Sequence, residues 1–270
     1  MSEQIGQPVR RVFLADGDAM GLSTSRLTAI LERVREALPK VSRVSSYCLP
    51  RNGERQRTRT QSCPLSHARP LVRARAVRGK SVEDLTALRE LGLRTMYVGC
   101  ESGDDEVLKR IGKGETQESS VAALRKLHAA GLKTSVMILH GLGGKALSEK
   151  HVSGSAELIR QAPPNYLSTL VVSFPRGAAR HEAGFLEDDG AGFEPLSTSE
   201  VVAEQYALLA QLDGLEPPKG SRGVIFRSDH ASNYLPLKGN LPRDRQRLLT
   251  LLGEAQEGRV RLRPEWARGL

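Results

Sequence analysis

The sequence predicts an α/β protein built around a parallel β-sheet, and three observations lead to this fold class. Short apolar runs alternate along the chain with longer segments whose apolar residues recur every three or four positions, as on one face of a helix. Two of the helical segments end at Gly92 and Gly131, and each glycine is followed by a leucine and then by a strand. Repeated strand–helix–strand units form parallel sheets with right-handed crossovers. Two architectures fit this pattern, an open doubly wound sheet and a partial barrel.

The expected strands and helices alternate from the N-terminus onward. The first helix begins after serine residues that suit an N-cap and ends at Pro39, and the next helix begins at Ser81. Glu83 and Asp84 follow Ser81, where the helix dipole favours acidic side chains. We expect strands at residues 11–15, 41–47, 94–99, 133–139 and 166–174, and helices at residues 27–38, 82–91, 117–130, 148–161 and about 198–212.

The composition excludes several classes of protein. With 39% hydrophobic and 26% charged residues, the chain is typical of globular proteins, and its 270 residues are enough for a sizeable core. No run approaches the roughly 18 apolar residues of a membrane span, and the N-terminus lacks the apolar stretch of a signal peptide. The three cysteines form no disulfide framework. We therefore expect a cytoplasmic protein with no membrane partner.

The positive charge of the chain is concentrated in one segment. Residues 51–80 carry nine basic side chains and a single acid, while the whole chain has a net charge of +9. Residues 53–79 show neither helical nor strand periodicity, so we expect a disordered basic insertion. One alternative is an arm that binds RNA or another acidic partner, although the segment lacks aromatic residues for base stacking. Another is sequence that does not belong to the fold.

Polar and glycine residues follow the expected strands, at the edge where parallel β/α folds place their binding sites. Structural interpretations remain open, since residues 16–18 suit a turn and Ser102 suits the N-cap of a helix. The candidate site residues are Asp16, Gly17 and Asp18 after the first strand, Ser46 at the end of the second, Glu101 and Ser102 after the third, and Gly141 and Gly143 after the fourth.

Five sequence motifs resemble those of a known family. They are FLADGDA at residues 13–19, SSY…PRN at 45–52, YVGCESGDDEVLKRIGKG at 97–114, ILHGLGG at 138–144 and FRSDHASNYLPLKGNLPRD at 226–244. The first four resemble successive strand ends of the radical S-adenosylmethionine (SAM) superfamily, and the fifth is similar to a signature of a bacterial-type subgroup. The resemblance covers residues 9–52 and 80–255.

The resemblance implies a partial (β/α) barrel of the radical SAM type, with parallel strands and outer helices. In this family a [4Fe–4S] cluster held by Cys-x₃-Cys-x₂-Cys reduces SAM, and the resulting 5′-deoxyadenosyl radical abstracts hydrogen from a substrate. The matching cofactor positions in this sequence are Asp16, Gly17 and Asp18 for the methionine amino group, Glu101 and Ser102 for ribose or carboxylate, Gly141 and Gly143 for adenine, and Ser46 beside them.

The sequence departs from the family pattern in two ways. Its 270 residues contain no Cys-x₃-Cys-x₂-Cys, so we expect no metal ligands, and we expect Cys48 and Cys100 to be structural. The chain starts at what resembles the family's second strand. This indicates an N-terminally truncated, incomplete barrel over residues 1–255, with the insertion at about 53–79 and a basic tail at 256–270.

The expected function is that of a radical SAM homologue that lacks cluster ligands and is inactive as it stands. SAM and a [4Fe–4S] cluster are the cofactors that the resemblance implies, and it assigns no substrate. One alternative is a non-catalytic scaffold or nucleotide-binding homologue. Another is a protein that binds RNA or an acidic partner through residues 51–80.

Overall fold

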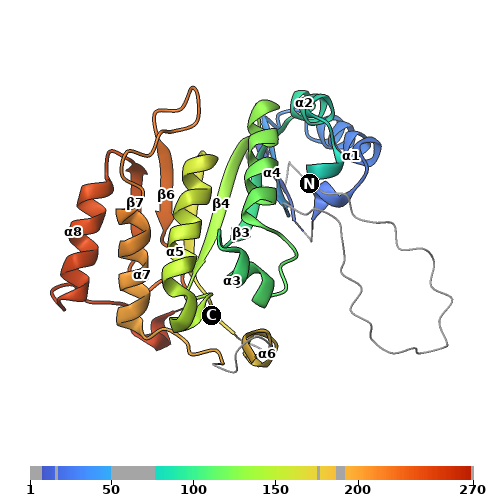
Figure 1. The fold of residues 1–270 in the computed structure, drawn as a ribbon. Coiled ribbons are helices and arrows are strands. Elements are labelled where there is room, and N and C mark those ends of the chain that lie inside the picture. The colour runs from blue at the N-terminus through green and yellow to red at the C-terminus, as the bar shows by residue number, and fades with distance from the viewer. Residues whose placement is uncertain (1–7, 16–17, 50–76, 175–176, 187–191, 269–270) are drawn as a thin grey trace, which may run out of the picture.

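The computed structural model describes residues 8–15, 18–49, 77–174, 177–186 and 192–268 of the chain (Figure 1). Within these residues, a seven-stranded sheet runs in the order β1 to β7, so that each strand pairs with its neighbours along the chain. The first six strands are parallel, and β7 is antiparallel to β6. The strands are β1 (Arg11–Leu14), β2 (Arg43–Cys48), β3 (Leu93–Glu101), β4 (Lys133–His140), β5 (Tyr166–Val171), β6 (Val224–Ser228) and β7 (Leu237–Leu241).

The sheet is open, because β1 and β7 lie at its two edges and do not pair with each other in the described part of the chain. Parallel strands joined by helices confirm the predicted α/β class, and an unclosed parallel sheet is what a partial barrel requires. The five expected strands all form. β6 and β7 lie beyond them and were not predicted, since β7 reverses direction and leaves the repeated strand–helix pattern.

A layer of helices covers one face of the sheet, and Figure 1 shows α4, α5, α7 and α8 side by side along it. Side-chain oxygens of Ser23, Ser81, Thr116 and Ser197 accept backbone N–H groups and so fix where four of the helices begin. In the described residues, no helix is both long and apolar enough to cross a membrane. The helices are α1 (Thr24–Ala37), α2 (Val82–Glu90), α3 (Asp105–Arg110), α4 (Gln117–Ala129), α5 (Gly144–Gln161), α6 (Ala179–Leu186), α7 (Thr198–Ala210) and α8 (Arg245–Gln256).

The two faces of the sheet differ in burial: the helix face packs under the helices, and the open face does not. Along β5, Leu167 and Thr169 are buried on the helix face, while the alternate residues Tyr166, Ser168 and Leu170 are only partly buried. Phe13 of β1 and Tyr47 of β2 belong to the open face and are 40% and 46% exposed. Successive strand residues point to opposite faces, so each strand presents alternate residues to the helices and to the open face. Because the helix layer does not cover the open face, a ligand can reach the residues on it.

Three helix starts differ from the sequence-based expectation. α1 begins at Thr24 rather than at residue 27, directly after its N-cap Ser23. α5 begins at Gly144 rather than at residue 148, because the glycine run itself leads into the helix. Asp104, and not Ser102, is the N-cap of α3, since the Asp104 carboxylate accepts the backbone N–H of Val107 at 2.9 Å. The Ser102 side chain is thereby left for a different contact.

The structure describes the last residues of the expected insertion and most of the expected C-terminal tail. Residues 50–76 lie outside the described residues, so the expected disorder stays a prediction. The described chain resumes at Val77, which is fully buried in the core and begins the 3₁₀ turn Val77–Gly79, within the last residues of the expected insertion at about 53–79. Near the C-terminus, Arg268 is buried and its Nε donates to the Ser232 carbonyl at 2.8 Å, which ties the basic tail to the loop between β6 and β7.

Candidate functional site

The carboxyl ends of the parallel strands share one edge of the sheet, and the predicted site residues gather along it. Asp18 follows β1, Glu101 ends β3, and His140 ends β4. A cavity lined in part by His128 and Lys133 lies at the opposite edge, where β4 begins. Since parallel β/α folds bind ligands at carboxyl ends, we place the candidate site at the edge that carries Asp18 and Glu101.

Glu101 has the most unusual backbone at this edge. Its φ of 67° makes it the one residue other than glycine with a positive φ in the described part of the chain. The pairing of β3 with β4 shifts register between Gly99 and Glu101, so the strand bulges there. A left-handed backbone at a residue with a Cβ costs about 1–2 kcal/mol. Strain of this kind persists when its surroundings force it, and it gathers at functional sites.

The Glu101 carboxylate lies on the open face. A Cβ built on Gly99 would be 3.3 Å from Glu101 Oε1, so both positions face the same side of β3. Glu101 Oε1 pairs with Lys113 Nζ at 2.5 Å. The Glu101 side chain is 29% exposed and that of Lys113 only 11%. A ligand therefore reaches the acid more easily than the base that holds it.

Three aromatic rings contact one another on the open face of β1, β2 and β3, with Tyr97 four residues before Glu101 on β3. The Phe13 ring packs edge-to-face on Tyr47 and Tyr97, with centroids 4.8 and 5.2 Å apart. Both Phe13 and Tyr47 keep more than a third of their surface exposed. The open face thus carries a partly exposed aromatic cluster on the strands that lead to Glu101, which suits the apolar part of a ligand.

Asp18 lies near a buried lysine that sequence reasoning missed. Lys80 Nζ donates to the carbonyls of Met20 and Leu22, both at 2.6 Å. Burial lowers the pKa of Lys80, and the negative charge of Asp18 partly opposes that shift. From the sequence, Lys80 was grouped with the basic segment 51–80. Its position directly before Ser81, the N-cap of α2, indicates instead that it is part of the folded structure.

The other predicted residues are engaged inside the protein. Ser46 lies on the helix face, is 1% exposed, and donates to the Leu14 carbonyl at 3.3 Å. Ser102 Oγ accepts the Asp104 N–H, and a Cβ on Gly143 would lie 3.1 Å from the backbone of Leu147. The Gly141 N–H donates to Glu204 of α7. Asp16 and Gly17 lie outside the described residues. Of the predicted residues that the structure describes, Glu101 has its carboxylate partly exposed on the open face, while Asp18 lies near the buried side chains of Lys80 and Cys48.

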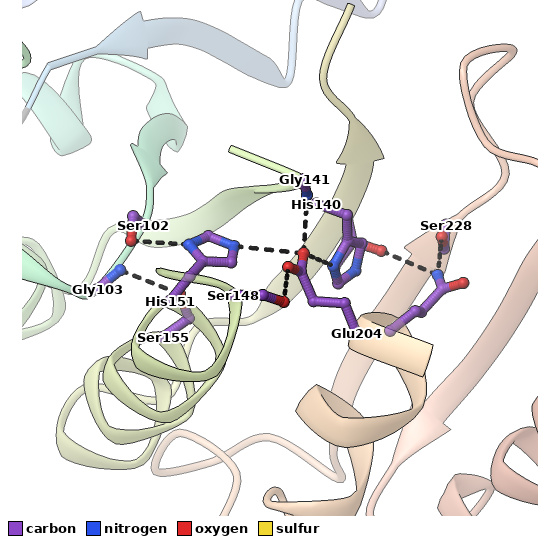
Figure 2. Close-up of polar contacts among 11 residues, drawn as sticks. Ser102, Gly103, His140, Gly141, Ser148, His151, Ser155, Glu204 and Ser228 are labelled. Carbon is purple, nitrogen blue, oxygen red and sulfur yellow. Dashed lines mark hydrogen bonds and ion pairs between the residues drawn. The ribbon is translucent and has the colours of Figure 1, made fainter. Parts of the chain in front are cut away.

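A polar cluster that sequence reasoning did not assemble lies behind this edge (Figure 2). His140 ends β4, His151 lies within α5, and Glu204 lies within α7. His140 Nδ1 is 3.1 Å from Glu204 Oε1, and His151 Nε2 is 3.9 Å from the same oxygen. Burial raises the pKa of Glu204, but hydrogen bonds from His140 and Ser148 and the nearby imidazoles outweigh it, so its pKa lies below the usual value. These residues are far apart in the chain, and their spacing carries no local signal.

Comparison with known proteins assigns the family. The profile of the Radical SAM superfamily matches residues 4–152, more than half of the chain. The chain belongs to the radical SAM superfamily. Among the curated proteins, a search found no match.

Solved structures show the same fold. Coproporphyrinogen III oxidase (HemN) from Escherichia coli, a radical SAM enzyme, is 16% identical with a TM-score of 0.53, over 76% of this chain and 41% of HemN. Archaeal Elp3 from Methanocaldococcus infernus, with residues 1–46 deleted, is 14% identical with a TM-score of 0.53, over 95% of this chain and 56% of Elp3. The radical SAM chain described here thus spans about half the length of these two relatives.

The superfamily uses SAM and a [4Fe–4S] cluster, and the cysteines of this radical SAM chain do not fit the cluster. Burial raises the pKa of the Cys100 thiol to about 12 and that of Cys48 well above its ordinary value. A cluster is held by thiolates, which such burial disfavours. Cys63 lies outside the described residues, and Cys-x₃-Cys-x₂-Cys does not occur in the 270 residues. We therefore derive no chemical step through a cluster.

Proposed function

We propose that the carboxyl edge of β1 to β3 binds SAM on the open face, as the SAM-binding part of a radical SAM site. The observation that carries this proposal is the strained, left-handed Glu101, whose carboxylate is partly exposed on that face. The superfamily match covers β1 to β4 and supports the same assignment. Glu101 accepts hydrogen bonds from the ribose hydroxyls of SAM, and Asp18 accepts hydrogen bonds from its methionine ammonium group.

We expect SAM to bind weakly, because two carboxylates hold it without help from a cluster iron. Hydrogen bonds to charged groups contribute about 1.5–3 kcal/mol each, so Asp18 and Glu101 together supply roughly two to four decades of affinity. In the superfamily the cluster iron also chelates the amino and carboxylate groups of methionine, and the cysteines of this chain do not fit that cluster. We expect a dissociation constant in the high micromolar range or weaker, and no cleavage of SAM by these 270 residues alone.

Calorimetric titration with SAM tests the proposal. Glu101→Gln should weaken binding by about tenfold or more, since a charged acceptor is replaced by a neutral one. Glu118→Gln is the matched control, because Glu118 is an exposed glutamate in the first turn of α4. Equal SAM affinity in the wild type and Glu101→Gln, or no heat of binding at millimolar SAM, would remove the proposed site.

A further inference from the structure

The cluster of His140, His151 and Glu204 is separate from the proposed SAM face. The three residues come from β4, α5 and α7, and each is at most 3% exposed. One ligand atom from each lies within 4.8 Å of the other two. Figure 2 shows the Glu204 carboxylate between the two imidazole rings. Two imidazoles and one carboxylate in a dry interior are the donor types that transition-metal sites use.

Hydrogen bonding accounts for the carboxylate but not for the rings. Glu204 Oε1 accepts the Gly141 N–H at 2.8 Å and faces His140 Nδ1, and Oε2 accepts the Ser148 hydroxyl at 2.5 Å. His140 Nε2 and His151 Nε2 are both buried without a hydrogen-bond partner in the described residues. A buried ring nitrogen without a partner is costly, and His151 Nε2 is the one that faces the Glu204 carboxylate, where an ion would satisfy it.

The geometry at His151 points to a cation between it and Glu204. His151 Nδ1 lies 2.8 Å from Ser102 Oγ, and Ser102 Oγ also accepts the Asp104 N–H. The Ser102 hydroxyl can accept the imidazole N–H or donate its own proton. In the tautomer with the His151 proton on Nδ1, the Nε2 lone pair faces Glu204 Oε1 at 3.9 Å. Two acceptors that face each other repel, whereas a cation between them binds both. Ligating histidines usually donate their second ring nitrogen in this way.

We propose that His140, His151 and Glu204 bind a divalent transition-metal ion of the zinc class. Nitrogen and oxygen ligands hold Zn²⁺ at about 2.0–2.2 Å, which sets tetrahedral ligand atoms roughly 3.3–3.6 Å apart. The separations from Glu204 Oε1, 3.1 Å to His140 Nδ1 and 3.9 Å to His151 Nε2, bracket that value. Ca²⁺ and Mg²⁺ are disfavoured because they prefer oxygen ligands alone.

The bound ion has a structural role in this proposal. It links the end of β4 to α5 and α7. Its positive charge also balances the negative charge of the buried Glu204, and an unbalanced buried charge destabilises a fold. Through His151 it also holds Ser102, the residue directly after Glu101. The ion therefore stabilises the helix layer at the point where it supports the strained end of β3.

Zinc titration of the full chain after dialysis against a chelator tests the site. We expect one Zn²⁺ per chain, a higher Tm with Zn²⁺, and a loss of zinc affinity greater than about 100-fold in His151→Gln, since even the loss of a group that hydrogen-bonds to a ligand costs about 10–100-fold. His128→Gln is the matched control, because His128 is a half-buried histidine on α4 that contacts Thr134. Unchanged zinc affinity in His151→Gln would overturn the proposal.

A second measurement uses Co²⁺ and needs no variant, in case a substitution prevents folding. Tetrahedral Co²⁺ bound by nitrogen and oxygen should give visible d–d bands without the near-ultraviolet charge-transfer bands of thiolate ligands. Thiolate bands would assign the metal to cysteine and contradict the site. A wild type that takes up neither ion and shows no change in Tm would indicate a protonated histidine paired with Glu204 instead, and would also overturn the proposal.

Discussion

Glu101 Oε1 lies 2.5 Å from Lys113 Nζ, while the Glu101 backbone holds a φ of 67°. The ion pair fixes the carboxylate on the open face, and the bulge after Gly99 forces the backbone that carries it. Both side chains of the pair are partly buried, and the left-handed backbone of Glu101 costs about 1–2 kcal/mol, which glycine at this position would avoid. A functional requirement at Glu101 therefore explains the residue better than backbone stability does.

Glu101→Gly separates strain from binding. Glycine adopts a positive φ without cost, so the variant recovers about 1–2 kcal/mol of strain and loses the ion pair. We expect its free energy of unfolding to stay within about 1 kcal/mol of the wild type or to rise, while SAM affinity falls by about tenfold or more. Denaturant unfolding and calorimetry on the same protein measure both. A large loss of stability with SAM affinity unchanged would make Glu101 a structural residue.

Gly103→Ala tests the close contact that holds α5 against the end of β3. A Cβ on Gly103 would overlap the backbone carbonyl of Gly154, which cannot move aside without shifting α5. Overpacking of this kind costs about 1–3 kcal/mol or more, and we expect a clear fall in Tm.

Gly253→Ala serves as the control for this substitution. Gly253 lies within α8, and a Cβ there meets nothing within 4 Å. Alanine in a helix is favoured over glycine by up to about 1 kcal/mol, so this variant should be as stable as the wild type or more stable. Equal Tm values for the two variants would contradict the proposed contact.

The buried thiols predict a loss of stability at alkaline pH. Burial raises the pKa of Cys100 to about 12, so the folded protein keeps this thiol neutral. The unfolded chain ionises it near pH 8.5, roughly its ordinary pKa. Stability is therefore complete below that pH and declines as the pH rises toward the folded value, by up to about 1.4 kcal/mol per pH unit for each thiol.

Denaturant unfolding at about pH 8 and about pH 10 measures this effect, with Cys100→Ala as the comparison. The wild type should lose more stability than Cys100→Ala over this range, since the variant has no thiol at that position. Parallel losses in the two proteins would show that Cys100 ionises as easily in the fold as outside it.

The edge of the basic insertion is also testable. Val77 is fully buried against the core, so Val77→Ala should lower the free energy of unfolding by about 2 kcal/mol. Deleting residues within 53–74 should change it by less than about 1 kcal/mol, because the cost of loop closure changes slowly with length. Urea unfolding compares the two proteins. A deletion that destabilises as much as Val77→Ala would show that the segment contributes to the core.

Sequence periodicity predicted the sheet well but not the orientation of every site residue. Five strands and the serine-capped helices followed from local spacing and capping, which are properties of neighbouring residues. In the run Ser45–Ser46–Tyr47, however, two adjacent serines hide the alternation, and Ser46 faces the helices. His140, His151 and Glu204 meet only because α5 and α7 pack beside the end of β4, and that packing is a property of the whole fold.

The central claim is that SAM lies with its methionine end at Asp18 and its ribose at Glu101. Calorimetric titration with SAM and with 5′-methylthioadenosine, which keeps the ribose and adenine but lacks the amino-acid part, tests it most directly. We predict that Asp18→Asn weakens SAM about tenfold without changing the affinity for methylthioadenosine, and that Glu101→Gln weakens both ligands. If Asp18→Asn weakened both ligands equally, or Glu101→Gln neither, the proposed orientation of SAM at this edge would be contradicted.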